Sequence, residues 1–292
     1  MIRELTLSPT SIAMLKRCPR SFWYKYVEKL PIPITEALAK GNVVHDVLEK
    51  FANTQFKLNE YNVEKVFERF VDQQIDISSQ RYLKYFKDEK EAKNDIKNIV
   101  YMFITRFIQE MKGLVESKIA TNYNHAFNLI KPKWTEQTLK DKNLNVMGKI
   151  DYIQTSPFSN KTTIIDYKTS KKYGYEFNND YKDQVAIYAY LASLNNIAAD
   201  TVAINYLRYG EIYFFEITPE LIAHARNEIR RARDFINLNY DKKENFYRKQ
   251  SSFCKFCPFY KHCLKELEEE KMEVDDNVNK RDGENKEENR SN

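Results

Sequence analysis

Apolar side chains follow a helical period over much of the first 130 residues. In stretches such as VFERFVDQQI and IVYMFITRFIQEM they recur at steps of three and four residues. This spacing predicts amphipathic helices over residues 36–130. Ser8-Pro9 is a typical helix start, so a further helical segment is expected over residues 8–30.

The pattern changes to alternation between Trp134 and Ser170. WTEQTLK, LNVMGKIDYIQ and TTIIDYKTS in this region predict successive strands. Helical spacing returns over 180–194, TVAINYLRYG and EIYFFEIT predict a strand pair joined near Gly210, and a helix is expected over 219–238. This order of helices and strands predicts an α/β or α+β domain with a large helical insertion.

Composition and charge narrow the class of protein. The chain is 42% apolar and 14% aromatic, enough for a core, yet has no run of 18 apolar residues that would span a membrane. Its start lacks the apolar stretch of a secretory signal, so we expect a cytoplasmic protein. Residues 266–292 hold 11 acidic and 5 basic side chains and are expected to be a disordered tail.

The charge outside this tail favours a polyanionic partner. Of the 47 basic and 42 acidic side chains, 42 and 31 remain in residues 1–265, a net charge of +11. A basic surface of this kind fits nucleic acid. A Lys-rich surface that is merely solvated explains the same charge equally well. The function therefore has to be inferred from specific residues and not from the net charge.

An acid and a lysine end the strand TTIIDYKTS. Strand alternation places Ile164, Asp166 and Lys168 on one face. The carboxylate suits a hard divalent cation, and the lysine could hold an attacking water or neutralise charge on a phosphate. An exposed ion pair at a strand end explains the pair as well if it is taken alone.

Further polar residues recur at spacings that suit the same site. Gly148 and Asp151 place a second carboxylate on the neighbouring predicted strand. Gly41, His45 and Glu49 are four residues apart and share a helix face, where His45 could give a nitrogen ligand. Together these groups predict a Mg²⁺ or Mn²⁺ site, although a lone helical histidine is usually an ordinary surface or core residue.

Four short motifs occur in the order GxxxH, GxxD, DxK and QxxxY. The succession resembles the PD-(D/E)XK nuclease superfamily, and more closely its RecB-like branch, from about Leu7 to Cys263. Each motif taken alone is only weakly specific for this superfamily, whereas the four motifs in this order are a much stronger indication. The matching positions are Gly41/His45, Gly148/Asp151, Asp166/Lys168 and Gln184/Tyr188.

The resemblance implies a fold and a role for each motif residue. The fold would be an α/β RecB-like core, a mixed central sheet flanked by helices, with the helical insertion at 55–130 shaping a channel for single-stranded DNA. Lys168 would position the nucleophilic water, and Gln184 and Tyr188 would help orient Lys168 and the DNA. The implied metal ligands are His45, Asp151, Asp166 and the backbone carbonyl of Tyr167.

The four cysteines are Cys18 and a C-x2-C-x5-C triplet of Cys254, Cys257 and Cys263. Four thiolates suit either a structural Zn²⁺ or an iron–sulfur cluster, and their spacing leaves both open. RecB-like nucleases of the iron–sulfur kind carry one cysteine before the nuclease motifs and this triplet after them. The resemblance therefore implies a [4Fe–4S] cluster that joins segments 1–30 and 240–265, with zinc as the alternative.

We therefore expect a single nuclease domain over residues 1–265, related to CRISPR-adaptation nucleases and AddB-type nuclease domains. Its expected activity is that of a Mg²⁺- or Mn²⁺-dependent deoxyribonuclease, an exonuclease on single-stranded DNA in repair, recombination or defence. The alternatives are a CRISPR-adaptation nuclease, an RNA-processing enzyme and a non-catalytic iron–sulfur DNA-binding subunit. The 106 residues from His45 to Asp151 favour the stand-alone exonuclease, because compact adaptation nucleases have a shorter spacing.

Two further features concern partners. The chain has no G-x-x-x-x-G-K-[ST] loop, so any unwinding would need a helicase partner. Aromatic and basic residues near Cys18 could contact a DNA strand. We favour packing in the core instead for at least two of Phe22, Trp23 and Tyr26. The candidate contacts are Arg17, Arg20, Phe22, Trp23, Tyr24 and Lys25.

Overall fold

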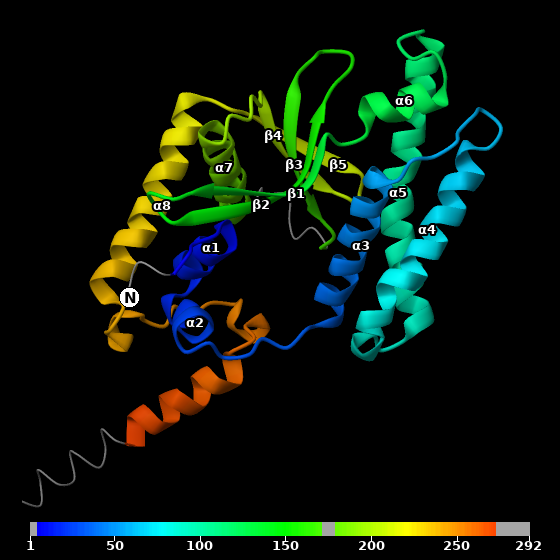
Figure 1. The fold of residues 1–292 in the computed structure, drawn as a ribbon. Coiled ribbons are helices and arrows are strands. Elements are labelled where there is room, and N and C mark those ends of the chain that lie inside the picture. The colour runs from blue at the N-terminus through cyan, green and yellow to red at the C-terminus, as the bar shows by residue number, and fades with distance from the viewer. Residues whose placement is uncertain (1–4, 171–178, 273–292) are drawn as a thin grey trace, which may run out of the picture. The chain divides into compact units, whose positions relative to one another are not determined.

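The computed structural model describes residues 5–170 and 179–272. Within these ranges the helices and strands follow the order that the sequence predicts (Figure 1). A helix over residues 260–272 continues past the predicted start of the tail at residue 266, and residues 273–292 of that tail lie outside the described residues. Every helix in the described ranges is too short or too polar to cross a membrane.

The chain divides into two compact units. The first unit comprises Met1–Ala13 and Ile34–Tyr240, and the second comprises Met14–Pro33 and Asp241–Asn292. The second unit therefore gathers the two cysteine-bearing segments that the sequence places at the ends of the domain.

The first unit contains a mixed five-stranded sheet in the order β1-β2-β3-β4-β5. Neighbouring strands are antiparallel except β3 and β4, which are parallel and joined through a helix. This arrangement confirms the predicted mixed sheet. The strands are β1 (Trp134–Asp141), β2 (Val146–Thr155), β3 (Thr162–Lys168), β4 (Thr201–Tyr206) and β5 (Glu211–Glu216).

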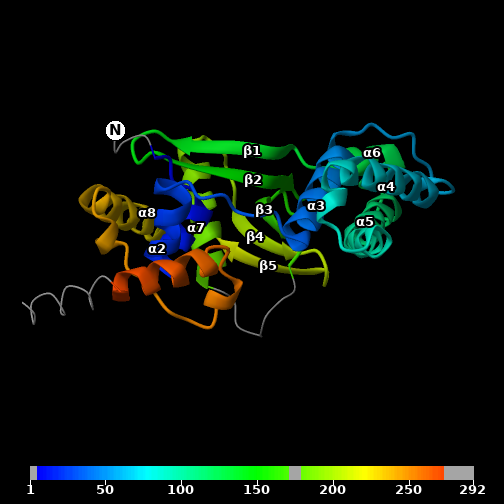
Figure 2. The ribbon, with the colours of Figure 1, turned by 90° about the horizontal axis from the view of Figure 1, so that it is seen from below.

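Helices cover both faces of this sheet (Figures 1 and 2). On one face α7 (Asn179–Leu194) contacts four of the strands and packs on α8 (Pro219–Asn239). On the other face, Tyr152 and Ile165 join one apolar core with the side chains of the helical insertion. The sheet is thus covered on both sides, and this explains why residues 164–167 of β3 are buried at four consecutive positions.

The helices of residues 36–130 contribute most of the side chains of this shared core. In α4, Phe67, Val71 and Ile75 lie four residues apart and are buried, as the helical period predicts. Phe51 packs its ring against several phenylalanines of this core. The helices are α3 (Glu36–Asn53), α4 (Val63–Ser79), the short η3 (Gln80–Tyr85), α5 (Glu89–Glu116) and α6 (Tyr123–Ile130).

The second unit is built from short helices. Phe22 and Trp23 are buried and pack against the ring of Phe246, so the packing interpretation of these aromatics is confirmed. Tyr24 is buried as well. Besides the helix over 260–272, the elements are α2 (Pro19–Phe22), η2 (Trp23–Val27), η4 (Lys243–Asn245), η5 (Cys254–Phe256) and the end of α1 (Pro9–Arg17), which begins in the first unit.

Candidate active site

Asp166 and Lys168 stand together at the end of β3, next to α7. Lys168 Nζ lies 2.6 Å from Asp166 Oδ2 and donates a 2.9 Å hydrogen bond to Gln184 Oε1. Gln184 Nε2 donates to Asp166 Oδ1 at 2.9 Å, and the Tyr188 hydroxyl donates to the same oxygen at 3.3 Å. Lys168 Nζ also lies 4.9 Å from the centre of the Tyr181 ring, a contact that the sequence does not predict.

Burial sets the charge state of this pair. Asp166 is 4% exposed, and its burial raises its pKa, although Lys168 opposes the rise. For Lys168, burial alone would lower the pKa, but the Asp166 carboxylate outweighs it and the net shift is upward. Lys168 therefore keeps its proton at neutral pH and can act as a hydrogen-bond donor and a positive charge.

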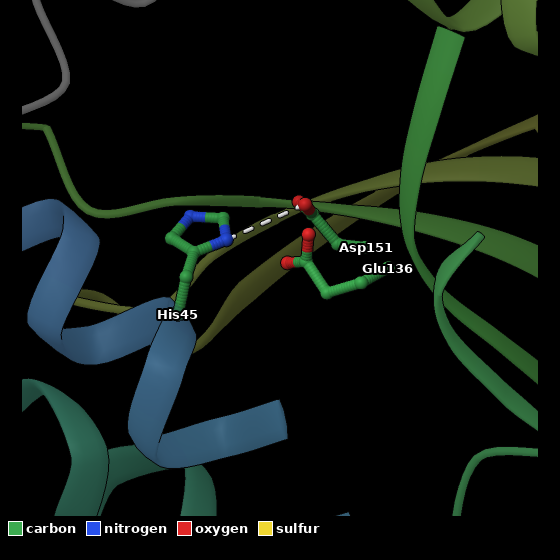
Figure 3. A group of neighbouring side chains, drawn as sticks. All are labelled: His45, Glu136 and Asp151. Carbon is green, nitrogen blue, oxygen red and sulfur yellow. Dashed lines mark ion pairs between the residues drawn. The ribbon is translucent and has the colours of Figure 1, made fainter. Parts of the chain in front are cut away.

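A second group of side chains comes from α3, β1 and β2 (Figure 3). His45 from α3, Glu136 from β1 and Asp151 from β2 bring ligand atoms to within 4.8 Å of one another. His45 Nδ1 lies 3.4 Å from Asp151 Oδ1. Burial lowers the pKa of His45, but Asp151 and the other carboxylates raise it by more. Among the described residues this trio alone forms a potential three-ligand metal site.

The trio borders a cavity of about 10 Å³, which is the room that one small ion or water needs. Glu49, one turn after His45 on α3, also lines this cavity. The donor set of one imidazole and several carboxylates fits a hard or borderline divalent cation such as Mg²⁺ or Mn²⁺.

The two groups meet at Tyr167. Its backbone N–H donates a 2.7 Å hydrogen bond to Asp151 Oδ2, so the residue between Asp166 and Lys168 contacts the second group directly. The structure thus gathers all the residues that the motifs indicate at one end of the sheet. Two of the predicted ligands, His45 and Asp151, lie in the three-ligand group, which also contains Glu136. Asp166 lies outside this group and contacts Lys168 and Gln184.

Glu136 is the site residue that the sequence analysis misses. Its φ of 55° lies in the left-handed region, which a residue with a side chain rarely adopts. Its carboxylate is 16% exposed and pairs with Lys149. Such backbone conformations are costly and concentrate at functional sites, where surrounding structure holds them. In the sequence, a lone Glu in the alternating stretch WTEQTLK gives no sign of this.

Replacing Glu136 by glycine is expected to change stability and metal binding in opposite directions. Glycine adopts a φ of 55° without strain, so the free energy of unfolding in EDTA should rise by about 1 kcal/mol. Loss of the carboxylate should weaken Mn²⁺ binding by about 10-fold or more. Urea unfolding and calorimetric titration with Mn²⁺ measure the two effects.

Lys118→Gly is the matched control, because Lys118 has a φ of 60° at an exposed position after α5. It should gain similar stability and keep the Mn²⁺ affinity of the native protein. Unchanged Mn²⁺ affinity in Glu136→Gly would exclude Glu136 as a ligand.

Gly148 explains how α7 reaches the site. A Cβ at this position would lie 2.9 Å from Leu191 Cδ1 and 3.0 Å from Tyr188 Cε1. Real side chains essentially never approach this closely, so β2 needs glycine here for α7 to pack on it. The close approach at Gly148 is therefore made by α7, the helix that carries Gln184 and Tyr188.

The four cysteines lie in the second unit and line one cavity of about 430 Å³. All four are free and half-buried. Burial raises the pKa of the Cys257 thiol, and the nearby thiols Cys18, Cys263 and Cys254 raise it further. The backbone N–H of Ser251 donates to Cys254 Sγ at 3.4 Å. Sulfur atoms from both segments thus face a shared space, although no three of these described thiols approach within 4.8 Å of one another.

The lining of this cavity contains Arg17, Arg20, Arg248 and Lys249, and no Asp or Glu from the described part of the second unit. Two of these side chains, Arg20 and Arg248, pair with Glu266, which lies outside the lining.

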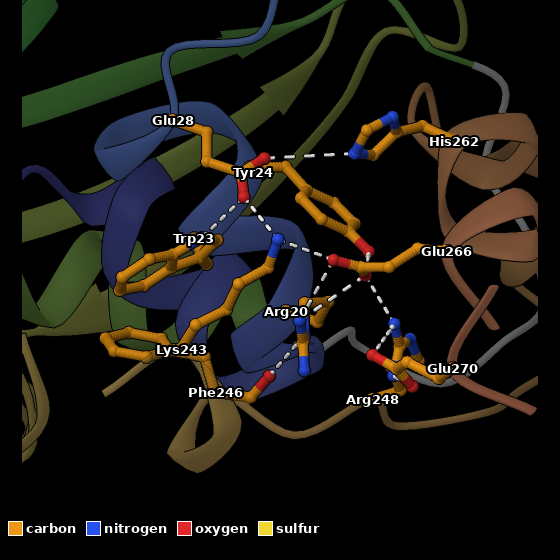
Figure 4. Close-up of polar contacts among 10 residues, drawn as sticks. All are labelled: Arg20, Trp23, Tyr24, Glu28, Lys243, Phe246, Arg248, His262, Glu266 and Glu270. Atoms are coloured by element: carbon orange, nitrogen blue, oxygen red, sulfur yellow. Dashed lines mark hydrogen bonds and ion pairs between the residues drawn. The ribbon is translucent and has the colours of Figure 1, made fainter. Parts of the chain in front are cut away.

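A half-buried carboxylate joins the segments of the second unit (Figure 4). Glu266 accepts hydrogen bonds from Arg20, at 3.3 Å, and from the Tyr24 hydroxyl, and it also pairs with Lys243 and Arg248. Burial alone would raise the pKa of Glu266, but these partners lower it to about 2. We call this cluster the Glu266 hub. It links the segment after Cys18 to the helix over residues 260–272, which carries Cys263.

His262, next to Cys263, belongs to a different set of contacts. Its Nε2 lies 3.8 Å from a Glu28 oxygen and its ring packs edge-on against Tyr24. It is absent from the residues that line the cysteine cavity. The thiols are therefore the candidate ligands there, as the sequence predicts.

Comparisons with known proteins agree with this geometry. The family model described as the PD-(D/E)XK nuclease superfamily matches residues 6–264. No curated protein matches the chain.

Two solved structures are similar at low identity. An exonuclease candidate from Eubacterium rectale is 12% identical over 88% of this chain and 87% of its own, with a TM-score of 0.49. SSO0001 is 18% identical over 74% of this chain and 91% of its own, with a TM-score of 0.30. Both TM-scores are too low for these likenesses to carry an argument about function.

Proposed function

This chain belongs to the PD-(D/E)XK nuclease superfamily, and we propose that it is a Mg²⁺- or Mn²⁺-dependent deoxyribonuclease that degrades single-stranded DNA from an end. The observation that carries the proposal is the buried Asp166–Lys168 pair, which lies beside the ligand group of His45, Glu136 and Asp151. The exonuclease mode follows the RecB-like resemblance of the four motifs.

The charge of the site supports a cation-dependent reaction. Glu49, Glu136, Asp151 and Asp166 supply four carboxylates, which outnumber the nearby lysines Lys149 and Lys168. Asp166 is buried and the other three carboxylates are half-buried, so a bound cation would offset their mutual repulsion. A divalent ion held by His45, Glu136 and Asp151 would activate water and offset charge on a phosphate.

The protein's own groups supply the rest of the chemistry. Hydrolysis of a phosphodiester places growing negative charge on the phosphate oxygens. Lys168 remains protonated, so it offers N–H donors and positive charge to the water or the phosphate and does not act as a base. Its side chain is only 18% exposed, so solvent screens this charge less than it would at the surface.

Gln184 and Tyr188 fix the orientation of the pair. Gln184 accepts from Lys168 and donates to Asp166, so its amide holds both charged groups at once. Tyr188 donates to Asp166 and accepts a 2.9 Å hydrogen bond from Gln184. These residues are positioning residues whose loss would disorder Lys168 without removing its charge.

For the cysteine cavity we propose a [4Fe–4S] cluster. Four thiols and a cationic lining suit an anionic thiolate-bound cluster. The resemblance of the cysteine pattern to that of RecB-like nucleases of the iron–sulfur kind favours a cluster over a single zinc ion, which four thiolates would also suit. The role we propose is structural, joining Cys18 to the C-terminal triplet.

DNA is the proposed substrate because the body of the chain is basic and the superfamily is one of nucleases. Unwinding of duplex DNA, where it is needed, is assigned to a helicase partner. Repair, recombination or defence is the proposed setting.

The test is a cleavage assay on protein purified without oxygen. Single-stranded DNA labelled at its 5′ or 3′ end should be shortened in Mn²⁺ or Mg²⁺ and left intact in EDTA, and the label that is released first gives the polarity. Binding without cleavage would identify a non-catalytic DNA-binding subunit. Preferred cleavage of a competing RNA would identify an RNA-processing enzyme. Either result overturns the proposal.

A further inference from the structure

Three aromatic side chains of the second unit are exposed around the cysteine cavity. Phe253 is 63% exposed, Phe256 is 70% exposed and Tyr260 is 41% exposed, and all three line the cavity. We call them the aromatic rim. Phe22, Trp23 and Tyr24 near Cys18, by contrast, are buried. Gathered apolar side chains on a surface usually mark a binding site, because their exposure to water is unfavourable.

Basic side chains accompany the aromatic rim. Lys255 lies between Phe253 and Phe256 in the sequence, and its Nζ is 5.1 Å from the Phe256 ring centre. Exposed Lys249 lines the same cavity. The nearest run of acids in the sequence, Glu268–Glu270, begins further along the C-terminal helix and does not line the cavity. The rim is therefore apolar and flanked by positive charge.

We propose that Phe253, Phe256 and Tyr260, with Lys249 and Lys255, bind unpaired bases and phosphates of single-stranded DNA. Exposed rings offer flat faces on which bases stack, and lysines between them meet the phosphates. Bases in a duplex have these faces covered by their neighbours, so the rim selects single strands. A protein partner is the weaker fit, since lysines are depleted in the centres of protein interfaces.

This inference rests on the proposed function only in taking DNA as the substrate; the surface shares no residue with the carboxylate site. It assigns to the second unit a role in holding the strand, besides any structural role of its thiols.

The test is fluorescence anisotropy of a labelled oligothymidylate with the full chain in EDTA, where no cleavage occurs. The double variant Phe253→Ala/Phe256→Ala should raise the Kd by about 10–100-fold, the effect of losing base stacking. Lys255→Ala should lower the dependence of log Kd on log salt by about 0.7, the value for one phosphate contact on a single strand.

Phe158→Ala/Phe214→Ala is the matched control. Both residues belong to the first unit and are 58% and 60% exposed, so the control removes the same surface chemistry elsewhere. Its Kd should equal that of the native protein. Circular dichroism and metal content should be the same for all variants, so that a change in Kd reports on the surface.

Native affinity in the rim double variant would overturn the proposal. So would an equal loss of affinity for single-stranded and fully paired DNA, because stacking on unpaired bases predicts a selective loss. The outcome is independent of catalysis: a rim effect in a protein that never cleaves DNA would support this surface and contradict the proposed nuclease.

Discussion

Replacing Lys168 by alanine is expected to lower the rate of DNA cleavage by about 10²–10³-fold, the usual effect of removing one preorganised donor in an active site. Its Nζ is held 2.6 Å from Asp166 Oδ2 and 2.9 Å from Gln184 Oε1, so the ammonium is fixed before substrate arrives. Single-turnover cleavage of end-labelled DNA at saturating Mn²⁺ measures this step without product release.

The Lys168→Ala substitution should also lower the stability of the fold, so folding must be measured separately from cleavage. Truncation of Lys168 leaves the Asp166 carboxylate buried without its cation, which costs about 3–5 kcal/mol in comparable buried pairs. Lys168→Arg keeps the positive charge and should remain folded, yet its planar guanidinium cannot reproduce the ammonium geometry, so cleavage should still fall. Lys140→Ala, at an exposed position of β1, controls for the loss of a surface lysine. Cleavage at the native rate by folded Lys168→Ala would remove Lys168 from the mechanism.

The fold was largely predictable because both periodicities are strong in this chain. Residues 144–154 and 162–170 alternate, and the structure places β2 and β3 there. The predicted helix at 219–238 is α8, which Thr218 caps by accepting from Leu221 N–H. The division into two units was not predictable, since it depends on contacts between residues 14–33 and 241–292 that no local pattern encodes.

The candidate site was predictable where its residues are neighbours in a motif. Asp166 and Lys168 share a strand face because of simple alternation, and Gln184 and Tyr188 share a helix face because they are four residues apart. Glu136 could not be found in this way. Its position depends on a left-handed backbone in β1 next to Asp151, a property of the folded sheet alone.

The contacts of the second unit were even harder to predict from local sequence. The Glu266 hub joins Arg20 and Glu266, which are 246 residues apart, and nothing in either local sequence indicates the partner. The aromatic rim was not predictable either. Phe253 and Phe256 are exposed whereas Phe259 in the same cysteine-bearing segment is buried, and the local sequence does not distinguish them.

Replacing Cys18 by serine is expected to remove most of the visible absorbance of thiolate-bound iron and to destabilise the second unit. Cys18 stands 236 residues before Cys254, so it alone brings a thiol from the N-terminal segment to the cavity. Metal–ligand free energy is folding free energy when the ligands come from separate segments. The midpoint of thermal unfolding of the second unit should fall by at least about 10 °C, the shift that a loss of a few kcal/mol gives in a small domain.

The Glu266 hub should limit the structural effect of replacing Cys18. Arg20 and Tyr24 contact Glu266 and not a thiol, so in Cys18→Ser the two segments should loosen without separating completely. Limited proteolysis should cut residues 241–272 faster in Cys18→Ser, while the first unit, with a separate core, resists as before. Ser252→Ala is the control, because Ser252 is exposed and lies two residues before Cys254. It should change neither the visible absorbance nor the rate of proteolysis. Full iron content in Cys18→Ser would exclude Cys18 as a ligand, and a colourless native protein that contains zinc would replace the cluster by a zinc site.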